Sequence, residues 1–235
     1  MQNIQIFDKP SPHIIIDNFL QPRQAKACLE EAIKLEPFYI DANVKGDDEI
    51  IEFKDHCEEC KLKYQSNRMN IRENKVVYLD DIYENKRQHS KILEYLHLAI
   101  TSDWLLKTIN KQGFFHILKH TTTTETILSR YGMCDFYGWH TDNINTNISG
   151  RLVTLCYYLN NEPEEFEGGE LIITGDSIHD SKNIIPKHNR AVLFQSDSTT
   201  HAVDTVKLNN KDFKNGRFSV NFWIGFTNNF NYRSN

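Results

Sequence analysis

The chain has 235 residues, of which 39% are hydrophobic and 25% charged, an ordinary composition for a globular protein. Its formal net charge of -5 disfavours a protein that grips a phosphate backbone, so we expect no nucleic-acid partner. No apolar run approaches the roughly 20 residues that a membrane-spanning helix needs, and no secretory leader is evident, so we expect a cytoplasmic protein away from membranes.

The first part of the chain predicts a strand followed by a helix. Residues His13 to Phe19 begin with a β-branched run, which is typical of a strand. Apolar residues then recur at the spacing of one helix face; they are Ala25, Cys28, Leu29, Ala32 and Ile33. Because Pro22 suits a first helical turn and Pro37 suits a stop, we expect the helix to lie between them.

Residues 41 to 70 are polar and charged without a clear period, and we expect a long loop that serves as a flap over the substrate. This stretch contains one C-x-x-C pair, Cys57 and Cys60. A structural zinc site needs four ligands and the sequence has no second such pair, so we prefer a plain loop or helix surface. The five cysteines are odd in number and irregularly spaced, which favours free thiols in a reducing compartment.

Helical spacing returns from about residue 88 to 111, and after Gly113 the pattern changes to short strands. The expected strands cover residues 114–120, 125–131, 151–159, 169–174, 190–195 and 217–226. Regularly spaced short strands without helices between them predict a sandwich or barrel. The expected fold is therefore α+β and mainly β, with the N-terminal helices packed on the outside of one sheet.

A candidate metal site begins with His140 and Asp142, which are two residues apart and face the same side of an extended chain. His201, which follows a predicted strand and a short polar turn, is the candidate third ligand. Two histidines and one carboxylate leave three positions of an octahedral ion open, as in non-haem iron(II) oxygenases. Zinc accepts the same residues, so a zinc hydrolase or a non-catalytic metal-binding barrel is an alternative.

The last predicted strand carries a cation on a face that should be buried. Alternation places Arg217, Ser219, Asn221 and Trp223 on one face, while the opposite face is apolar. A buried guanidinium needs a partner, and a dicarboxylate that chelates the metal at its other end would supply one, with Ser219 adding a hydroxyl. The alternatives are a solvent-exposed face or a protein carboxylate beside Arg217. Tyr158, on the strand 151–159, either donates its hydroxyl to the same ligand or packs in the core.

These segments together resemble the prolyl-hydroxylase branch of the 2-oxoglutarate oxygenases, above all the enzymes that act on the hypoxia-inducible factor and their microbial relatives. The likeness covers about residues 128 to 226. Its motifs, in chain order, are Tyr137-Gly138-Trp139-His140-Thr141-Asp142-Asn143, the run GRLVTLCYYLN from Gly150 to Asn160, Gly168-Gly169-Glu170-Leu171, His201-Ala202-Val203, and the run RFSVNFW from Arg217 to Trp223.

The resemblance implies a double-stranded β-helix that holds iron through His140, Asp142 and His201. It also implies that Arg217 pairs with the distal carboxylate of 2-oxoglutarate. Collagen-type relatives use a lysine ten residues after the second histidine, where this chain has Lys211. We prefer Arg217 as the anchor, because Lys211 lies in a polar loop and should point to solvent.

The resemblance assigns further side chains around the metal. Tyr131 and Tyr158 fall where the family places tyrosines that contact the co-substrate. Arg151 and Trp223 fall where the hypoxia-type enzymes contact their prolyl substrate. Asn143, next to a metal ligand in the sequence, is expected to orient a ligand without binding the metal itself.

The sequence therefore predicts an iron(II)- and 2-oxoglutarate-dependent hydroxylase that uses O2, releases succinate and carbon dioxide, and takes ascorbate as a candidate reductant. A prolyl residue in a protein or peptide is the preferred substrate, and a free amino acid or other small molecule is the alternative. We expect one domain over residues 1–235, in which 1–112 supply a strand, supporting helices and the long loop, and 113–230 form the catalytic barrel. The oligomeric state stays open.

Overall fold

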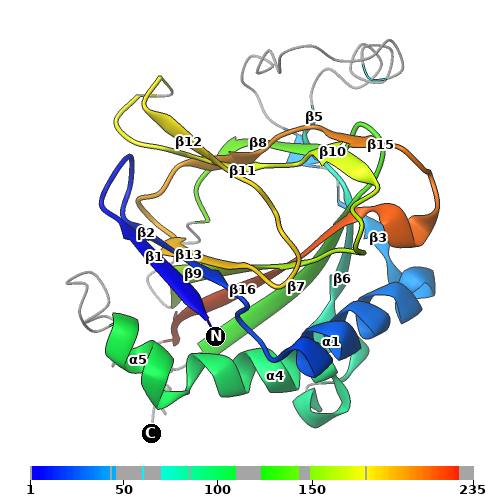
Figure 1. Ribbon diagram of the computed structural model, residues 1–235, viewed down its shortest axis with the longest axis horizontal. Coiled ribbons are helices and arrows are strands. Elements are labelled where there is room, and N and C mark those ends of the chain that lie inside the picture. Colours follow the sequence, from blue (N-terminus) through cyan, green and yellow to red (C-terminus); the bar gives the residue numbers. More distant parts are fainter. Residues whose placement is uncertain are drawn as a thin grey trace, which may run out of the picture.

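The computed structural model describes residues 2–42, 44–45, 60, 70–84, 86–109, 123–142, 149–177 and 179–227. Two antiparallel sheets form two layers that face each other (Figure 1). The eight-stranded sheet has the spatial order β1 (Asn3–Phe7), β2 (His13–Asp17), β13 (Ala191–Gln195), β9 (Ser149–Leu159), β16 (Arg217–Thr227), β7 (Thr123–Tyr131), β6 (Lys75–Tyr78) and β3 (Ile40–Asp41). The six-stranded sheet has the order β12 (Ser181–Ile184), β11 (Leu171–Thr174), β14 (His201–Val203), β8 (Phe136–His140), β5 (Asn70–Glu73) and β4 (Val44–Lys45). A separate ribbon pairs β10 (Phe166–Gly168) with β15 (Val206–Leu208).

The large sheet separates an apolar core from the space between the two sheets. Its central strand, β16, pairs with β9 on one side and with β7 on the other. Phe218, Val220 and Phe222 are fully buried in the main hydrophobic cluster. Arg217 and Ser219, which alternate with them, line a cavity between the sheets. The alternation predicted for this strand therefore separates packing residues from polar residues.

Helices cover the outer face of the large sheet (Figure 1). They are α1 (Pro22–Lys34), α3 (Leu79–Ile82), α4 (Lys91–Ile100) and α5 (Asp103–Ile109), with short 3-10 turns at Glu36–Phe38, Arg87–His89 and Phe213–Asn215. The buried residues of α1 are Ala25, Cys28 and Ala32, whose spacing forms one apolar stripe against the sheet. None of the described helices has the length and apolar character needed to cross a membrane.

The helical spacing expected over residues 88–111 is confirmed in the described part of the chain, where it forms two helices, α4 and α5. The first, α4, ends at Ile100 and is followed by Thr101, whose hydroxyl donates to the carbonyl of His97 at 2.8 Å. The hydroxyl of Ser102 donates to the carbonyl of Ala99, so both side chains compete locally with the helical backbone. The chain therefore turns at this point before α5 begins.

The expectation of an α+β, mainly β chain braced by N-terminal helices is confirmed. The strands expected from residue 125 onward are present within a few residues, whereas residues 114–120 lie outside the described part of the chain. Shorter strands were not anticipated, notably β1, β8 and β14. Each is only three to five residues long, which is too short for a period of two to be distinctive.

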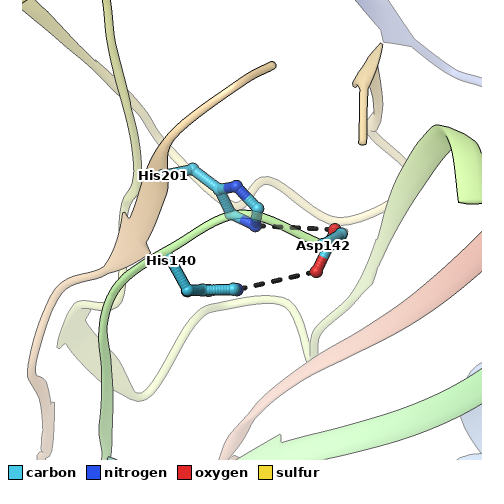
Figure 2. A group of neighbouring side chains, drawn as sticks. All are labelled: His140, Asp142 and His201. Carbon is cyan, nitrogen blue, oxygen red and sulfur yellow. Dashed lines mark ion pairs between the residues drawn. The ribbon is translucent and has the colours of Figure 1, made fainter. Parts of the chain in front are cut away.

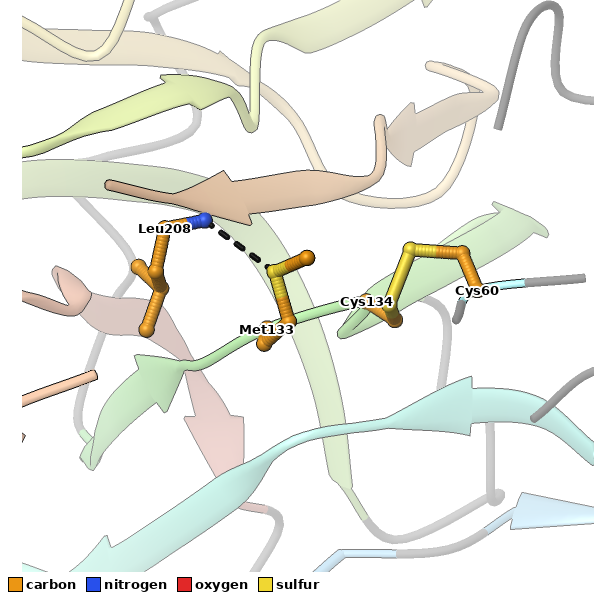
Figure 3. Close-up of a disulfide and its surroundings, with 4 residues drawn as sticks. All are labelled: Cys60, Met133, Cys134 and Leu208. Carbon is orange, nitrogen blue, oxygen red and sulfur yellow. Dashed lines mark hydrogen bonds between the residues drawn. A yellow bond between two sulfur atoms is a disulfide. The ribbon is translucent and has the colours of Figure 1, made fainter. Parts of the chain in front are cut away.

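A disulfide joins Cys60 to Cys134 across a sequence separation of 74 (Figure 3). Cys134 lies in the turn between β7 and β8, next to Met133, whose sulfur accepts a hydrogen bond from the backbone N–H of Leu208. The expectation of free thiols is therefore wrong for this pair, because two distant cysteines meet where sequence spacing gave no sign of it. Cys28 and Cys156 are free and buried, and Cys57 lies outside the described residues.

Candidate active site

The two candidate histidine ligands are neighbours on adjacent strands of the smaller sheet. His140 ends β8 and His201 begins β14, and the two residues are directly paired in the antiparallel register. Their ring centroids lie 4.1 Å apart. Cross-strand partners project their side chains to the same face, so this register alone brings the two imidazoles together.

Asp142 completes the cluster from two residues beyond the end of β8. One carboxylate oxygen, Oδ1, lies 3.6 Å from His140 Nε2, and the other, Oδ2, lies 3.6 Å from His201 Nε2 (Figure 2). The ligand atoms of the three residues all lie within 4.8 Å of one another. Two imidazole nitrogens and a carboxylate at this separation can hold one metal ion, as the prediction of a metal site requires.

Both imidazoles are oriented by backbone carbonyls. His140 Nδ1 lies 2.8 Å from the carbonyl oxygen of Gly138, and His201 Nδ1 lies 3.0 Å from that of Thr199. A carbonyl only accepts, so each Nδ1 carries a proton and each Nε2 is the ring nitrogen that faces the cluster. The Nε2 of His140 is buried without a hydrogen-bond partner, which is expected of an atom that awaits a cation.

The environment favours the protonation states that bind metal. Burial lowers the pKa of His201 to about 4, so its ring is neutral near pH 7. Burial acts to raise the pKa of Asp142, but the nearby His201 and His140 outweigh it and hold that pKa below its usual value. At neutral pH the cluster therefore offers a carboxylate at Asp142 and a neutral imidazole at His201.

A small cavity extends from these histidines to Arg217. Arg217 is 1% exposed; its Nε donates to the carbonyl of Gly169 at 3.0 Å and its Nη1 to the hydroxyl of Ser219 at 2.8 Å. Among the residues that the structure describes, no carboxylate forms an ion pair with this guanidinium. Both alternatives raised from the sequence, a solvent-exposed face and a protein carboxylate, therefore find no support in the described residues.

Two tyrosines flank the guanidinium. The ring centroids of Tyr131 and Tyr158 lie 4.7 Å and 5.0 Å from Arg217 Cζ, and both rings line the cavity. The Tyr158 hydroxyl is buried without a hydrogen-bond partner, and burial raises the pKa of both phenols. Each therefore stays protonated and can donate to an anion in the cavity.

The residues expected to contact a substrate lie together at the edge of the site. Arg151 Cζ lies 3.7 Å from the ring centroid of Trp223, and its Nη2 donates to Glu125 Oε2 at 2.6 Å. The indole N–H of Trp223 is buried without a hydrogen bond of standard geometry, and it lies close enough to Asp142 to help lower the pKa of that carboxyl. Trp223 therefore lies next to the metal cluster.

Lys211 is exposed in the loop after β15, as expected of a residue that does not anchor the ligand. Asn143 lies outside the described residues. The sequence analysis missed Tyr137, whose ring stacks on His140 with centroids 3.6 Å apart and carries Arg72 on its other side, with Cζ 4.6 Å from the ring centroid. Nothing in the local pattern marks Arg72, because it reaches the site through the pairing of β5 with β8.

Comparison with known sequences identifies proteins that are similar to part of this chain. Residues 126–225 match the model of the 2OG-Fe(II) oxygenase superfamily. A PKHD-type hydroxylase from Picosynechococcus is 34% identical over 113 residues, which are 48% of this chain and 46% of that protein. An uncharacterised PKHD-type hydroxylase from Synechocystis is 29% identical over 96 residues, which are 38% of this chain and 32% of that protein. The matches thus span less than half the length of these curated relatives.

Solved structures show the same fold over most of the chain. A prolyl hydroxylase from Trichoplax adhaerens, in complex with a hypoxia-inducible-factor peptide, superposes with a TM-score of 0.59 and 20% identity, covering 90% of this chain and 82% of that one. A prolyl-4-hydroxylase from Pseudomonas putida superposes with a TM-score of 0.56 and 19% identity, covering 96% and 92%. The expected double-stranded β-helix is confirmed.

Proposed function

Because this chain carries a domain of the 2OG-Fe(II) oxygenase superfamily, of the prolyl-hydroxylase type, we propose that it is an iron(II)- and 2-oxoglutarate-dependent hydroxylase. The observation that carries the proposal is the buried guanidinium of Arg217, which has no carboxylate partner among the described residues and shares its cavity with His140 and His201. A zinc hydrolase using the same three ligands has no need for a carboxylate anchor at this place.

The described residues fit the metal. In the proposal, His140 Nε2, His201 Nε2 and the Asp142 carboxylate hold iron(II), and the backbone carbonyls behind the histidines fix the rings. When bound, iron(II) with 2-oxoglutarate and O2 supplies the hydroxylation of a C–H bond and the release of succinate and carbon dioxide.

The co-substrate has a matching set of contacts. Arg217 pairs with the distal carboxylate of 2-oxoglutarate, and Ser219 holds the guanidinium through the bond at Nη1. Tyr158, whose hydroxyl has no hydrogen-bond partner among the described residues, donates to the same carboxylate. The ring of Tyr131 also packs against the guanidinium. The apolar wall of the cavity, which includes Leu171, keeps water from the guanidinium and strengthens its pairing.

For the substrate we propose a prolyl residue in a protein or peptide. The proposal is supported by the likeness to prolyl hydroxylases and by the contact of Arg151 with Trp223, which itself lies near Asp142. Because Arg151 is held by Glu125 and by the Trp223 ring, it presents a fixed cation at the edge of the site. A free amino acid or other small molecule is the alternative.

We further propose that residues 1–235 act as one domain whose catalytic core is 113–230, since the helices bury their apolar faces in the same cluster as the large sheet. Ascorbate as reductant and a cytoplasmic location remain predictions. The Cys60–Cys134 disulfide counts against the location, because reducing compartments keep such thiols apart.

Turnover assays test the reaction and the substrate separately. The full chain is incubated with iron(II), 2-oxoglutarate and O2, together with either a library of proline-containing peptides or the free amino acids. Succinate release that depends on iron and 2-oxoglutarate, coupled to a mass gain of one oxygen atom in a peptide, is the expected result. Turnover of free amino acids with no peptide modified would reject the peptidyl substrate while leaving the reaction class in place.

A further inference from the structure

The two oxygens of the Asp142 carboxylate have different surroundings. The hydroxyl of Thr154 donates a hydrogen bond to Oδ2 at 2.7 Å. Oδ1 lies 3.6 Å from His140 Nε2, and Oδ2 lies 3.6 Å from His201 Nε2. The carboxylate is 6% exposed and Thr154 is fully buried, so water competes little for this hydrogen bond. The Thr154 hydroxyl thus fixes a carboxylate whose two oxygens each face one imidazole nitrogen.

The hydroxyl of Ser196 forms a hydrogen bond with that of Thr154. Ser196 Oγ lies 2.9 Å from Thr154 Oγ1, and Ser196 is also fully buried. An ionised carboxylate can only accept, so the single proton of the Thr154 hydroxyl goes to Asp142. The proton between the two hydroxyls therefore comes from Ser196, and the bonds run in one direction from Ser196 through Thr154 to Asp142.

The backbone of the same serine fixes the same aspartate. The N–H of Asp142 donates to the carbonyl of Ser196 at 3.0 Å, and the N–H of Ser196 donates to the carbonyl of Leu152 at 3.0 Å. Ser196 follows β13, and Thr154 lies in β9, the strand that pairs with β13. Asp142 follows β8, a strand of the smaller sheet. Both its backbone and its side chain are thereby hydrogen-bonded to residues that lie in or directly after strands of the large sheet.

We propose that Thr154 and Ser196 are positioning residues that hold the Asp142 carboxylate in its orientation toward His140 and His201. The inference rests on the proposed function, since it requires a metal among His140, Asp142 and His201. A hydrogen bond of this kind orients a metal ligand, and its loss weakens metal binding.

The test measures metal affinity in the full chain, by anaerobic titration with cobalt(II) or iron(II), for three variants. Thr154→Val keeps the shape and removes the hydroxyl, and should weaken metal binding by about 10–100-fold. Thr154→Ser restores a hydroxyl and should recover most of the affinity. Thr126→Val is the matched control, because Thr126 is a buried β-strand threonine whose hydroxyl has no hydrogen-bond partner, and it should bind metal as the wild type does.

A fourth variant helps to separate lost positioning of Asp142 from a general disturbance of packing. Ser196→Ala leaves Thr154 in place without its donor, and should weaken metal binding less than Thr154→Val does. Wild-type affinity in Thr154→Val would overturn the inference while leaving the proposed function intact. Equal losses in Thr154→Val and Thr126→Val would also overturn it, since they would reflect altered packing alone. Failure of the wild type to bind either metal would instead contradict the proposed function.

Discussion

Arg217 is buried without a carboxylate partner among the described residues, and a bound ligand would explain this burial. It is 1% exposed and donates to a backbone carbonyl and a hydroxyl, neither of which carries a charge. Burying a guanidinium without a counter-charge costs several kcal/mol, so the fold carries a penalty that a bound carboxylate removes. Arg217 and the two histidines line the same cavity, which is where that carboxylate would bind.

Replacing Arg217 with alanine should raise the 2-oxoglutarate concentration needed for half-maximal turnover. Truncating one partner of a buried charge pair costs about 2–5 kcal/mol, which corresponds to roughly 30-fold or more. Steady-state kinetics with varied 2-oxoglutarate provide the measurement. Lys211→Ala is the control and should match the wild type, because that side chain is exposed. An effect seen only in Lys211→Ala would show that the anchor is misassigned.

His13, outside the active site, predicts a pH dependence of stability. It is fully buried and its pKa is lowered, mainly by burial, so the unfolded chain takes up a proton before the folded one does. Its contribution to stability is present above the unfolded pKa of about 6.5 and is lost as the pH falls below it, by up to about 1.4 kcal/mol per unit. Urea unfolding at about pH 7.5 and about pH 5.5 should give a smaller difference for His13→Asn than for the wild type. Equal differences would contradict this account.

Single residues were predictable from the sequence where spacing carries the information. His140 and Asp142 are two apart, and Arg217 sits on the polar face of an alternating strand. Tyr137 and Ser196 were not predictable in the same way, because their roles depend on which strands become neighbours. Thr154 shared a predicted strand face with Tyr158, but only the contact with Asp142 gives it a role.

At the scale of elements, β16 combines packing and chemistry in one strand. Its Phe218, Val220 and Phe222 hold the helices and sheet together, while its other face supplies Arg217 and Ser219. Because side chains alternate strictly along a strand, changes on one face should leave the other face in place. Stability and co-substrate binding are therefore separable by mutation.

Phe222→Ala should lower the free energy of unfolding by about 3–5 kcal/mol, since a fully buried phenylalanine leaves a cavity in the core. Denaturant unfolding measures this loss. The half-saturating 2-oxoglutarate concentration of the folded variant should stay close to that of the wild type, in contrast to Arg217→Ala. A large rise in that concentration for Phe222→Ala would mean that the two faces are coupled.

The Cys60–Cys134 disulfide should stabilise the fold by constraining the unfolded chain. It closes a long loop, with a sequence separation of 74, so Cys134→Ser should cost about 2–4 kcal/mol in the free energy of unfolding under oxidising conditions. A thiol reductant should destabilise the wild type by a similar amount and leave Cys134→Ser unaffected. Equal stability of wild type and variant without reductant would contradict the bond.

The long strands of the sheet were predictable because each has several alternating or β-branched residues, as in β9 and β16. The short strands β8 and β14 were not, although they carry both histidines. They form because neighbouring strands supply their hydrogen bonds, which is information that a local pattern does not contain. The split between α4 and α5 was missed for a related reason, since it depends on local hydroxyl bonds of Thr101 and Ser102.

At the scale of the whole molecule, the two sheets line one cavity and contribute different residues to it. The smaller sheet supplies His140 and His201, and the large sheet supplies Arg217, Ser219 and Tyr158. The helices that the structure describes pack on the large sheet's outer face (Figure 1). The architecture was predictable from the order of helical and β segments, whereas the arrangement of strands into two facing sheets came from the structure and from its likeness to prolyl hydroxylases.

The most direct test of the central claim is anaerobic addition of 2-oxoglutarate to the iron(II)-loaded full chain, followed by visible absorption. If the metal and the guanidinium share one co-substrate, a weak charge-transfer band should appear in the wild type. The band should need far more 2-oxoglutarate in Arg217→Ala and should be absent in His201→Ala. No band at saturating 2-oxoglutarate in a wild-type protein that holds iron would contradict the account.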